Sequence, residues 1–451
     1  MSQFRFARLF MMLAAVGLNV ASTSAHAQKN PMPSSSATTA GPKAAAGAAP
    51  AAGAAAAPAD SVRPEIFKLM DPAAIKPLME AKNFTEVQTR ITQAEAIADK
   101  TPYETYVIDR TKYVLGASSG NEQMTTTALE SIIASNRLKG EEQANYIRAM
   151  ADNYYNAKNY PKAVEWYKRY QKESATPEKV RASLVRSYYL SDDFTSAKAE
   201  LLPVIAAAEA AGTKPTEEDL RLLSSVATKM KDDAGYLVAL EKLAASYPSD
   251  EIWRGLINRG VAKKPGFNPQ LNVINVYRLE SSAVKKMTAE DYVEYAELSL
   301  EATSPTEAKK IMDAGFAAGV LGVDANAAKQ KQLRDRATKS AADDAKNIAS
   351  GEATATKAKT GAGLVNLGWA YSTMDQYDKG IAMMQQGIAK GGLKSPEDAK
   401  LRLGMAQAHA GKKADAIATF QTIKGGGGAG DLAKYWIVFL NSPTSANFAS
   451  K

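Results

Sequence analysis

The chain has 451 residues, a formal net charge of +8, no cysteine and two histidines, His26 and His409. Without cysteine it can form no disulfide, no thiol nucleophile and no thiolate site for zinc. A Ser–His–Asp triad or a histidine metal site could be built only around these two imidazoles. We therefore predict no catalytic residue, no metal and no cofactor. We expect the protein not to be an enzyme, although chemistry by carboxylates alone stays formally open.

Residues 1–27 have the three parts of a secretory signal peptide. Two arginines give a basic start, an apolar run covers residues 9–20, and Ala25 and Ala27 supply the small residues of a cleavage site. A retained membrane helix is the alternative, but the apolar run is shorter than the roughly 20 residues that span a bilayer. We expect export to the periplasm or out of the cell, and no membrane span in the rest of the chain.

Residues 28–63 are rich in Ala, Pro, Gly and Ser and nearly free of large apolar side chains. Such a segment cannot bury enough surface to offset the entropy of ordering it, so we expect a disordered tether. From Pro64 onward apolar residues recur at intervals of three and four, with Gly, Pro or Asn-Asp pairs as interruptions. The predicted fold class is all-α, with short links between helices.

A repeat is visible within this helical region. The segment 153–167 aligns with 187–201, which follows 34 residues later, and with 370–384. Tyr154 then corresponds to Tyr188, and small residues occupy matching positions further along. Small and aromatic residues at fixed offsets with a period of 34 indicate a repeated helix-turn-helix unit.

This pattern resembles the tetratricopeptide repeat family. The residues that carry the resemblance are Leu364, Leu367, Gly368, Tyr371, Tyr377, Gly380 and Met384 in one unit, and Ala151, Tyr154, Tyr160, Ala163, Tyr167 and Pro177 in another. Further units centre on Ala197, Ala308 and Ala416. Gly380 replaces the alanine that the family has where two helices cross.

The resemblance implies a right-handed superhelical solenoid of helical hairpins, built either as one superhelix or as two arms. The expected parts are an N-terminal array (64–350), a hinge (351–362), a C-terminal pair of repeats (363–424), a Gly-rich joint (425–430) and an apolar capping helix (431–442). One hairpin cannot bury its apolar face alone, so neighbouring hairpins must stack.

The rings of the stretch 153–170 could form a binding box or could pack between hairpins. The repeat pattern favours packing for Tyr154, Tyr160, Tyr167 and Tyr170. The large apolar residues of the capping helix are expected to pack on the last repeat, or else to dock on a partner.

The resemblance also implies which residues of the first helices face a concave groove. These positions are Arg148, Asp152 and Tyr155 in one unit, and Lys179, Arg186 and Tyr189 in the next. Arg and Tyr often carry binding energy, so this basic and aromatic patch would suit an acidic or extended peptide. Asp152 stands where family members that clamp a terminal carboxylate have asparagine, which puts such a clamp in doubt. An ordinary hydrated surface is the alternative interpretation.

Three further candidates lie toward the C-terminus. One helical face carries Glu290, Glu294, Glu297 and Glu301. It could bind a basic segment or a cation, but it is also what a solvated acidic face looks like, and no oxygen-rich loop for a metal accompanies it. In the C-terminal pair of repeats, Trp369 and His409 fall at groove positions.

These features predict a non-catalytic scaffold or adaptor of the cell envelope that binds a protein or peptide segment in a concave groove. The alternative is an accessory protein that binds an acidic glycan or another polyanion. Its support is Tyr155, Tyr189, Trp369 and the 17 basic against 10 acidic residues in 331–451. Nucleic acid is not an expected partner of an exported chain with diffuse charge.

Overall fold

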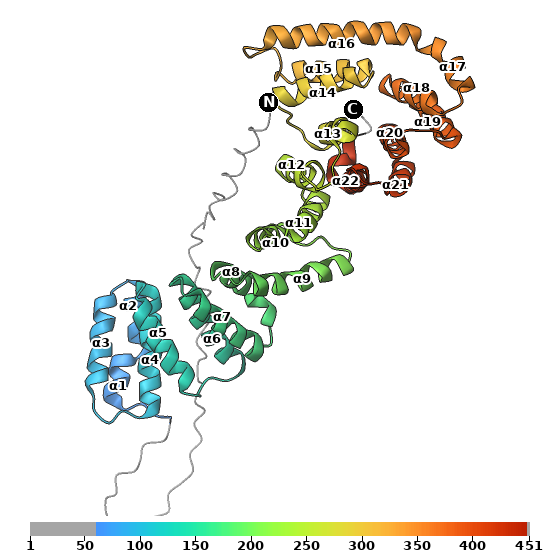
Figure 1. The fold of residues 1–451 in the computed structure, drawn as a ribbon. Helices are drawn as coiled ribbons and strands as arrows, with labels where there is room; N and C mark the ends of the chain where they lie inside the picture. The colour runs from blue at the N-terminus through green and yellow to red at the C-terminus, as the bar shows by residue number, and fades with distance from the viewer. Residues whose placement is uncertain (1–59, 449–451) are drawn as a thin grey trace, which may run out of the picture. The chain divides into compact units, whose positions relative to one another are not determined.

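The computed structural model describes residues 60–448 (Figure 1). Within this range the chain forms α-helices, short 3₁₀ or π-helical segments and no β-strand, which confirms the predicted all-α fold. The predicted signal peptide and almost all of the predicted tether lie outside the described residues. None of the helices between residues 60 and 448 is long and apolar enough to cross a membrane.

The helices follow one another with short connections. The first are α1 Pro64–Met70, α2 Pro72–Glu80, α3 Phe84–Ala96, α4 Pro102–Ser119, α5 Glu122–Ala134, α6 Gly140–Asn156, α7 Tyr160–Glu173, η2 Pro177–Val180, α8 Arg181–Leu190, α9 Phe194–Ala210, α10 Glu217–Lys229 and α11 Asp233–Ser246. Then come α12 Asp250–Ile257, η3 Asn258–Ala262, α13 Pro269–Ala283, α14 Ala289–Glu301, α15 Pro305–Ala317, α16 Ala327–Asn347, η4 Ile348–Gly351 and α17 Glu352–Lys357. The last are α18 Ala362–Thr373, α19 Tyr377–Lys390, α20 Pro396–His409, α21 Lys413–Gln421, α22 Ala429–Asn441 and η5 Pro443–Asn447.

One turn recurs between the two helices of successive hairpins. A residue with positive φ follows the first helix at Lys82, Gly120, Lys158, Asp192, Lys231, Thr303, Asp375 and Gly411. The next backbone N–H then donates to the carbonyl five residues earlier, as Asn159 N does to Tyr154 O at 2.8 Å. In the first five of these hairpins that next residue is Asn or Asp, and its side chain accepts from the N–H three residues on. The turn therefore ends one helix and caps the next with the same few residues.

The repeat positions pack as the sequence predicted. Ala163, Tyr167 and Tyr170 are fully buried, and Tyr154 is nearly so. Tyr160 is half-buried and meets the edge of the Tyr155 ring. These rings fill the space between hairpins, which confirms that Tyr154, Tyr167 and Tyr170 are packing residues.

Helices α18 and α19 approach each other closely through glycine. A Cβ added at Gly368 or at Gly380 would overlap the backbone of the other helix. The replacement of alanine by Gly380 thus matches a crossing that has no room for a methyl group.

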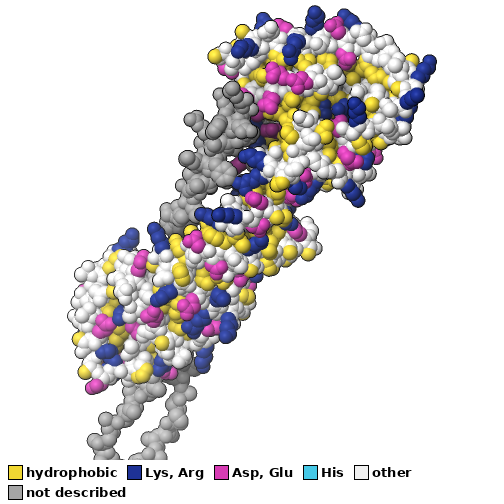
Figure 2. Space-filling view, viewed as in Figure 1, with side chains coloured by type: hydrophobic (Ala, Val, Ile, Leu, Met, Phe, Trp, Pro, Cys, Tyr) yellow, Lys and Arg dark blue, Asp and Glu magenta, His cyan; other side chains and the backbone are white. Residues whose placement is uncertain are grey.

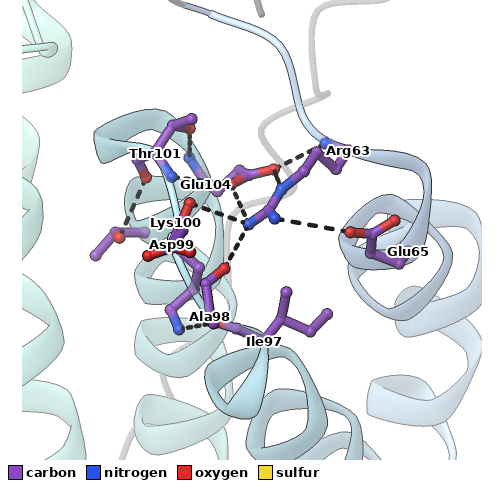
Figure 3. Close-up of polar contacts among 9 residues, drawn as sticks. Arg63, Glu65, Ile97, Ala98, Asp99, Lys100, Thr101 and Glu104 are labelled. Atoms are coloured by element: carbon purple, nitrogen blue, oxygen red, sulfur yellow. Dashed lines mark hydrogen bonds and ion pairs between the residues drawn. The ribbon is translucent and has the colours of Figure 1, made fainter. Parts of the chain in front are cut away.

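The start of the described region is clamped by one buried carboxylate (Figure 3). Glu104 Oε1 accepts hydrogen bonds from the backbone N–H and from Nε of Arg63, each at 2.9 Å. Its Oε2 accepts from Nη2 of Arg63 at 3.0 Å and from Thr101 N at 2.9 Å, which completes a capping box at the start of α4. These bonds tie the residue before α1 to the α3–α4 turn.

Helix α22 is buried along most of its length and joins parts that are distant in sequence. It packs on α20 and α21, and also on α11 and α13. Trp436 stacks on Phe420 of α21, with ring centres 5.8 Å apart, and Phe439 meets Trp253 of α12 edge-on at 6.1 Å. The expected capping helix therefore also holds the last repeats against the middle of the chain.

The segment expected to be a hinge, residues 351–362, contains the short helix α17. Before it, α16 buries Gln330, Leu333, Ala337 and Ala341 on one face and packs on α14 and α15. Helix α15 also contacts α18 directly. The helices α16 and α17 therefore form a long connection between α15 and α18, which are in contact with each other.

Candidate partner-binding surface

A group of half-buried tyrosines and arginines lies on the first helices of successive hairpins. We call it the tyrosine–arginine surface, and it consists of Tyr113 on α4, Tyr146, Arg148 and Tyr155 on α6, and Arg186 and Tyr189 on α8. The Tyr113 and Tyr146 rings are 5.5 Å apart and join α4 to α6. The four tyrosines pack partly against the core, so their backbones and rings are held by the helices that carry them.

Arg148 is the free cation of this surface. It is half-buried and forms no hydrogen bond or ion pair with any described residue. Its neighbour Asp152 is engaged elsewhere, because the Tyr167 hydroxyl donates to its carboxylate at 2.6 Å. Burial raises the pKa of Asp152, and the charge of Arg148 opposes that rise only in part. Arg148 therefore keeps its donors available to a partner.

Tyr155 and Tyr189 occupy equivalent places in two consecutive repeats. Tyr155 meets Tyr160 edge-on with ring centres 5.6 Å apart and planes at 67°, and Tyr189 meets Phe194 at 5.6 Å and 66°. Burial raises the pKa of Tyr155, and the nearby Arg186 charge lowers it in part. The sequence-predicted residues Arg148, Tyr155, Arg186 and Tyr189 are thus brought onto neighbouring helices.

Two residues that the sequence assigned to this group, Asp152 and Lys179, are not part of the tyrosine–arginine surface. Asp152 binds the core hydroxyl of Tyr167, so its carboxylate supports the hairpin. Lys179 lies in η2 and is exposed, outside the first-helix face that carries Arg186 and Tyr189. Arg186 forms an ion pair with Glu218 of α10, which leaves Arg148 as the less engaged arginine.

The acidic face of α14 is separate from this surface. Glu290, Glu294, Glu297 and Glu301 are all exposed. The partly buried Tyr277 hydroxyl lies beside Glu294, whose charge adds to the rise that burial causes in the pKa of Tyr277. No group of carboxylates, histidines or cysteines within residues 60–448 has the arrangement of a metal site.

Trp369 does not face an open groove, which corrects the sequence prediction. Its side chain is buried, its indole N–H points to Glu307 Oε2 at 3.4 Å, and the guanidinium of Arg278 lies 4.3 Å from its ring centre. Helices α13 and α15 therefore occupy the space that a partner would need.

His409 is also turned toward the protein's own rings. It stacks on Tyr377 with planes at 2° and centres 6.3 Å apart, and Phe448 lies 4.5 Å away on another side. Burial lowers the pKa of His409 to about 4, so the imidazole is neutral at pH 7. The expected groove position is already filled by residues of the same chain.

A buried polar centre was missed by the sequence argument. Arg278 of α13 forms two hydrogen bonds of 2.8 Å to the carboxylate of Glu307 on α15, and Tyr295 donates to the same carboxylate at 2.8 Å. Arg278 also donates to Asn275 Oδ1 at 2.8 Å, and Asn275 donates to Asp398 of α20 at 3.0 Å. The sequence contains one indication of this centre: Asn272, Asn275 and Arg278 are spaced by three residues, which places their polar groups on one face of α13.

Comparison with known proteins supports the repeat architecture. Residues 398–424, which cover most of α20 and α21, match the model of the tetratricopeptide repeat family. Forty-one chains of solved structures are similar to this chain. No curated protein matches it.

Two of the similar structures show how distant these likenesses are. A chain of Naa15/Naa10 bound to HypK-THB is 12% identical with a TM-score of 0.25, and the match covers 82% of this chain and 64% of that one. Yeast Tom70 is 11% identical with a TM-score of 0.19, and the match covers 85% of this chain and 95% of that one. This chain therefore spans 64% of the length of the first structure.

The hairpins with one shared turn define an all-α helical-repeat protein. Within this architecture, residues 398–424 are the segment that matches a tetratricopeptide repeat.

Proposed function

We propose that the protein is a non-catalytic scaffold that binds a peptide segment of a protein partner on the tyrosine–arginine surface. The observation that carries this proposal is Arg148, a half-buried arginine without a hydrogen bond or ion pair among the described residues. It lies near Tyr113 of α4, on the helix α6 that also carries the half-buried Tyr155. Tyrosine and arginine are the residue types that most often dominate binding energy at interfaces. Rings already held by packing lose little entropy when a partner binds.

The charge of this surface favours a partner segment that carries a carboxylate. The guanidinium of Arg148 offers a planar set of donors that matches a carboxylate. Tyr155 lies on the same helix as Arg148, and Tyr113 lies on α4, the first helix of the preceding hairpin. Both rings could cover the apolar part of such a segment. We further propose that the protein acts outside the cytoplasm, in the cell envelope, because residues 1–27 have the pattern of a signal peptide.

The test compares two double variants with the wild type. In Arg148→Ala/Tyr155→Ala the surface loses its free cation and one central ring. The control Trp166→Ala/Arg169→Ala removes an arginine and an aromatic ring from the second helix α7, where the Arg169 guanidinium lies 5.1 Å from the centre of the Trp166 ring. Partners are captured by crosslinking from the envelope fraction, and the affinity for the purified partner is then measured by titration calorimetry.

The proposal predicts that the first variant binds the partner at least tenfold more weakly, while the control stays within about threefold of the wild type. Circular dichroism and thermal unfolding of each variant check that the fold is kept. Equal losses in both variants, or no loss in the first, would count against the tyrosine–arginine surface.

A polyanion is the second candidate partner, and one surface supports it. The outer side of α16 carries Lys331, Arg336 and Lys339, which form no ion pair with any described residue. Lys and Arg side chains project along the edge of the molecule where α16 lies (Figure 2). Binding of an acidic polysaccharide that weakens steeply with added salt, and that is lost in Lys331→Glu/Lys339→Glu, would support this function.

A further inference from the structure

The last described residues fold back onto aromatic rings of the C-terminal repeats. After α22 the chain continues as η5, and the Phe448 ring then lies 4.5 Å from His409, 5.0 Å from Phe439 and 6.1 Å from Trp436. We call the three rings around Phe448 the aromatic socket. Tyr377 stacks on the His409 imidazole and supports it from α19.

The socket itself belongs to the rigid part of the fold. Trp436 and Phe439 are fully buried on α22, where Trp436 stacks on Phe420 and Phe439 meets Trp253. His409 is held at the end of α20. These rings therefore keep their places whether or not Phe448 is present, because other helices fix them.

The segment that carries Phe448 is held far less firmly. Its hydrogen bonds are local: Ser445 Oγ donates to the carbonyls of Leu440 and Ser442, each at 2.9 Å, and Phe448 N donates to Ser445 O at 3.0 Å. Pro443 and Ala446 are exposed. Among the described residues, Phe448 is the one large apolar side chain of this segment, so its ring anchors the segment in place.

The aromatic socket is rigid and Phe448 is held only weakly, so the two are arranged like a binding site and its ligand. A short segment held by local hydrogen bonds and one ring opens at low cost in free energy compared with global unfolding. Once open, the socket would present three aromatic rings to solvent, and such a patch favours contact with another aromatic side chain.

We propose that the aromatic socket is a second binding site, for a partner segment that inserts an aromatic side chain, and that Phe448 is the resident occupant which that segment displaces. Binding at this site would be held back by the protein's own segment that carries Phe448. The proposal concerns α20 and α22 and does not depend on the tyrosine–arginine surface.

The test uses the full chain and a synthetic peptide of residues 443–451, PTSANFASK, with a fluorescent label. The same peptide with alanine in place of its phenylalanine is the control ligand. Binding is measured by fluorescence anisotropy to the wild type, to Phe448→Ala and to Thr444→Ala, a substitution in the same segment that leaves the ring in place.

The expected result is that Phe448→Ala binds the phenylalanine peptide at least tenfold more tightly than the wild type, because the resident competitor is gone. Thr444→Ala should behave as the wild type, and the alanine peptide should bind no form detectably. Should Phe448→Ala prove unfolded, Phe448→Leu gives the same comparison, because leucine keeps an apolar side chain but removes the ring.

Equal affinity of the wild type and the Phe448 variant, or equal binding of the two peptides, would overturn the proposal. The double variant Arg148→Ala/Tyr155→Ala is titrated with the same peptide. Since it keeps the socket, it should match the wild type, and the two proposed sites can fail independently.

Discussion

Arg278 and Glu307 form a buried, two-bonded ion pair, with both nitrogen–oxygen distances at 2.8 Å. Tyr295 donates a third hydrogen bond to the carboxylate, and the Trp369 indole N–H lies 3.4 Å from it. These partners come from α13, α14, α15 and α18, so one carboxylate holds four helices. The positive charge of Arg278 lowers the pKa of Glu307 against the opposite effect of burial.

The first prediction concerns this carboxylate. Glu307→Gln keeps the shape but leaves the Arg278 charge buried without a counter-charge, and such losses typically cost about 3–5 kcal/mol in the free energy of unfolding. Chemical denaturation at pH 7 measures the change. The matched control is Glu301→Gln, because the Glu301 side chain at the end of α14 is exposed; this variant should stay within about 0.5 kcal/mol of the wild type. Equal effects of the two substitutions would refute the structural role given to Glu307.

The second prediction concerns the crossing of α18 and α19. Gly380→Ala places a methyl group against the backbone carbonyl of Gly368 and against Ser372, so the helices must separate. We expect a loss of about 1–3 kcal/mol, as for other cases of overpacking. The control Gly351→Ala meets only Leu367 at 3.6 Å, an ordinary contact, and should be nearly neutral. Thermal unfolding compares the two, and a stabilised Gly380 variant would show that the crossing is looser than described.

The third prediction concerns pH and His409. Its pKa falls from 6.5 to about 4 on folding, chiefly through burial, although Glu307 and Asp375 favour its charged form. The unfolded chain therefore binds a proton that the folded chain resists, so stability is full above pH 6.5 and is lost as the pH falls toward 4. The loss attributable to His409 is up to about 3 kcal/mol, since each pKa unit corresponds to about 1.4 kcal/mol.

The variant His409→Phe keeps a ring between Tyr377 and Phe448 but cannot titrate. Its free energy of unfolding should vary less than that of the wild type between pH 6.5 and 4. Urea titrations at steps of half a pH unit measure both curves. Parallel curves would mean that His409 does not resist protonation in the folded protein.

The fourth prediction concerns Glu104. The Arg63 side chain, followed by the backbone N–H groups of Arg63 and Thr101, lowers the pKa of Glu104 to about 2. A carboxyl whose folded pKa is depressed stabilises the protein above its unfolded pKa of 4.5, and this contribution is lost as the pH falls toward 2. Glu104→Gln should therefore melt at a lower temperature at pH 7, and the difference from the wild type should shrink below pH 4.5. A difference that is constant with pH would point to packing instead of charge.

The hairpins could be predicted from the sequence because their signals are local. Tyr154, Tyr167 and Ala163 recur at fixed spacing, and the turn residues before Asn159 and Asp193 lie within a few positions of the helices they join. Burial of these rings follows directly from the repeat. The sequence also predicts that Tyr155 and Tyr189 occupy the same repeat position, because they are separated by the 34-residue period.

The contacts between distant hairpins could not be predicted in this way. Trp369 and His409 are on the first helices of their hairpins, at positions where the repeat pattern predicts an open groove. In the structure Arg278 covers Trp369 and Phe448 covers His409. The periodicity of the sequence does not indicate which distant residue packs on a given position. The buried pairing of Arg278 with Glu307 likewise requires α13 and α15 to be placed first. Residues close together in the sequence determine each hairpin, whereas ion pairs between hairpins depend on how the hairpins stack.

Site-specific photocrosslinking tests the proposed binding of a protein partner at the tyrosine–arginine surface. A photoreactive amino acid is placed in turn at Tyr155, at Tyr189, at Lys168 on the exposed side of α7 and at Glu290 on the acidic face of α14. We expect the same partner to be crosslinked from positions 155 and 189, with little or none from 168 and 290. Crosslinks of equal strength from all four positions, or from position 290 alone, would contradict it.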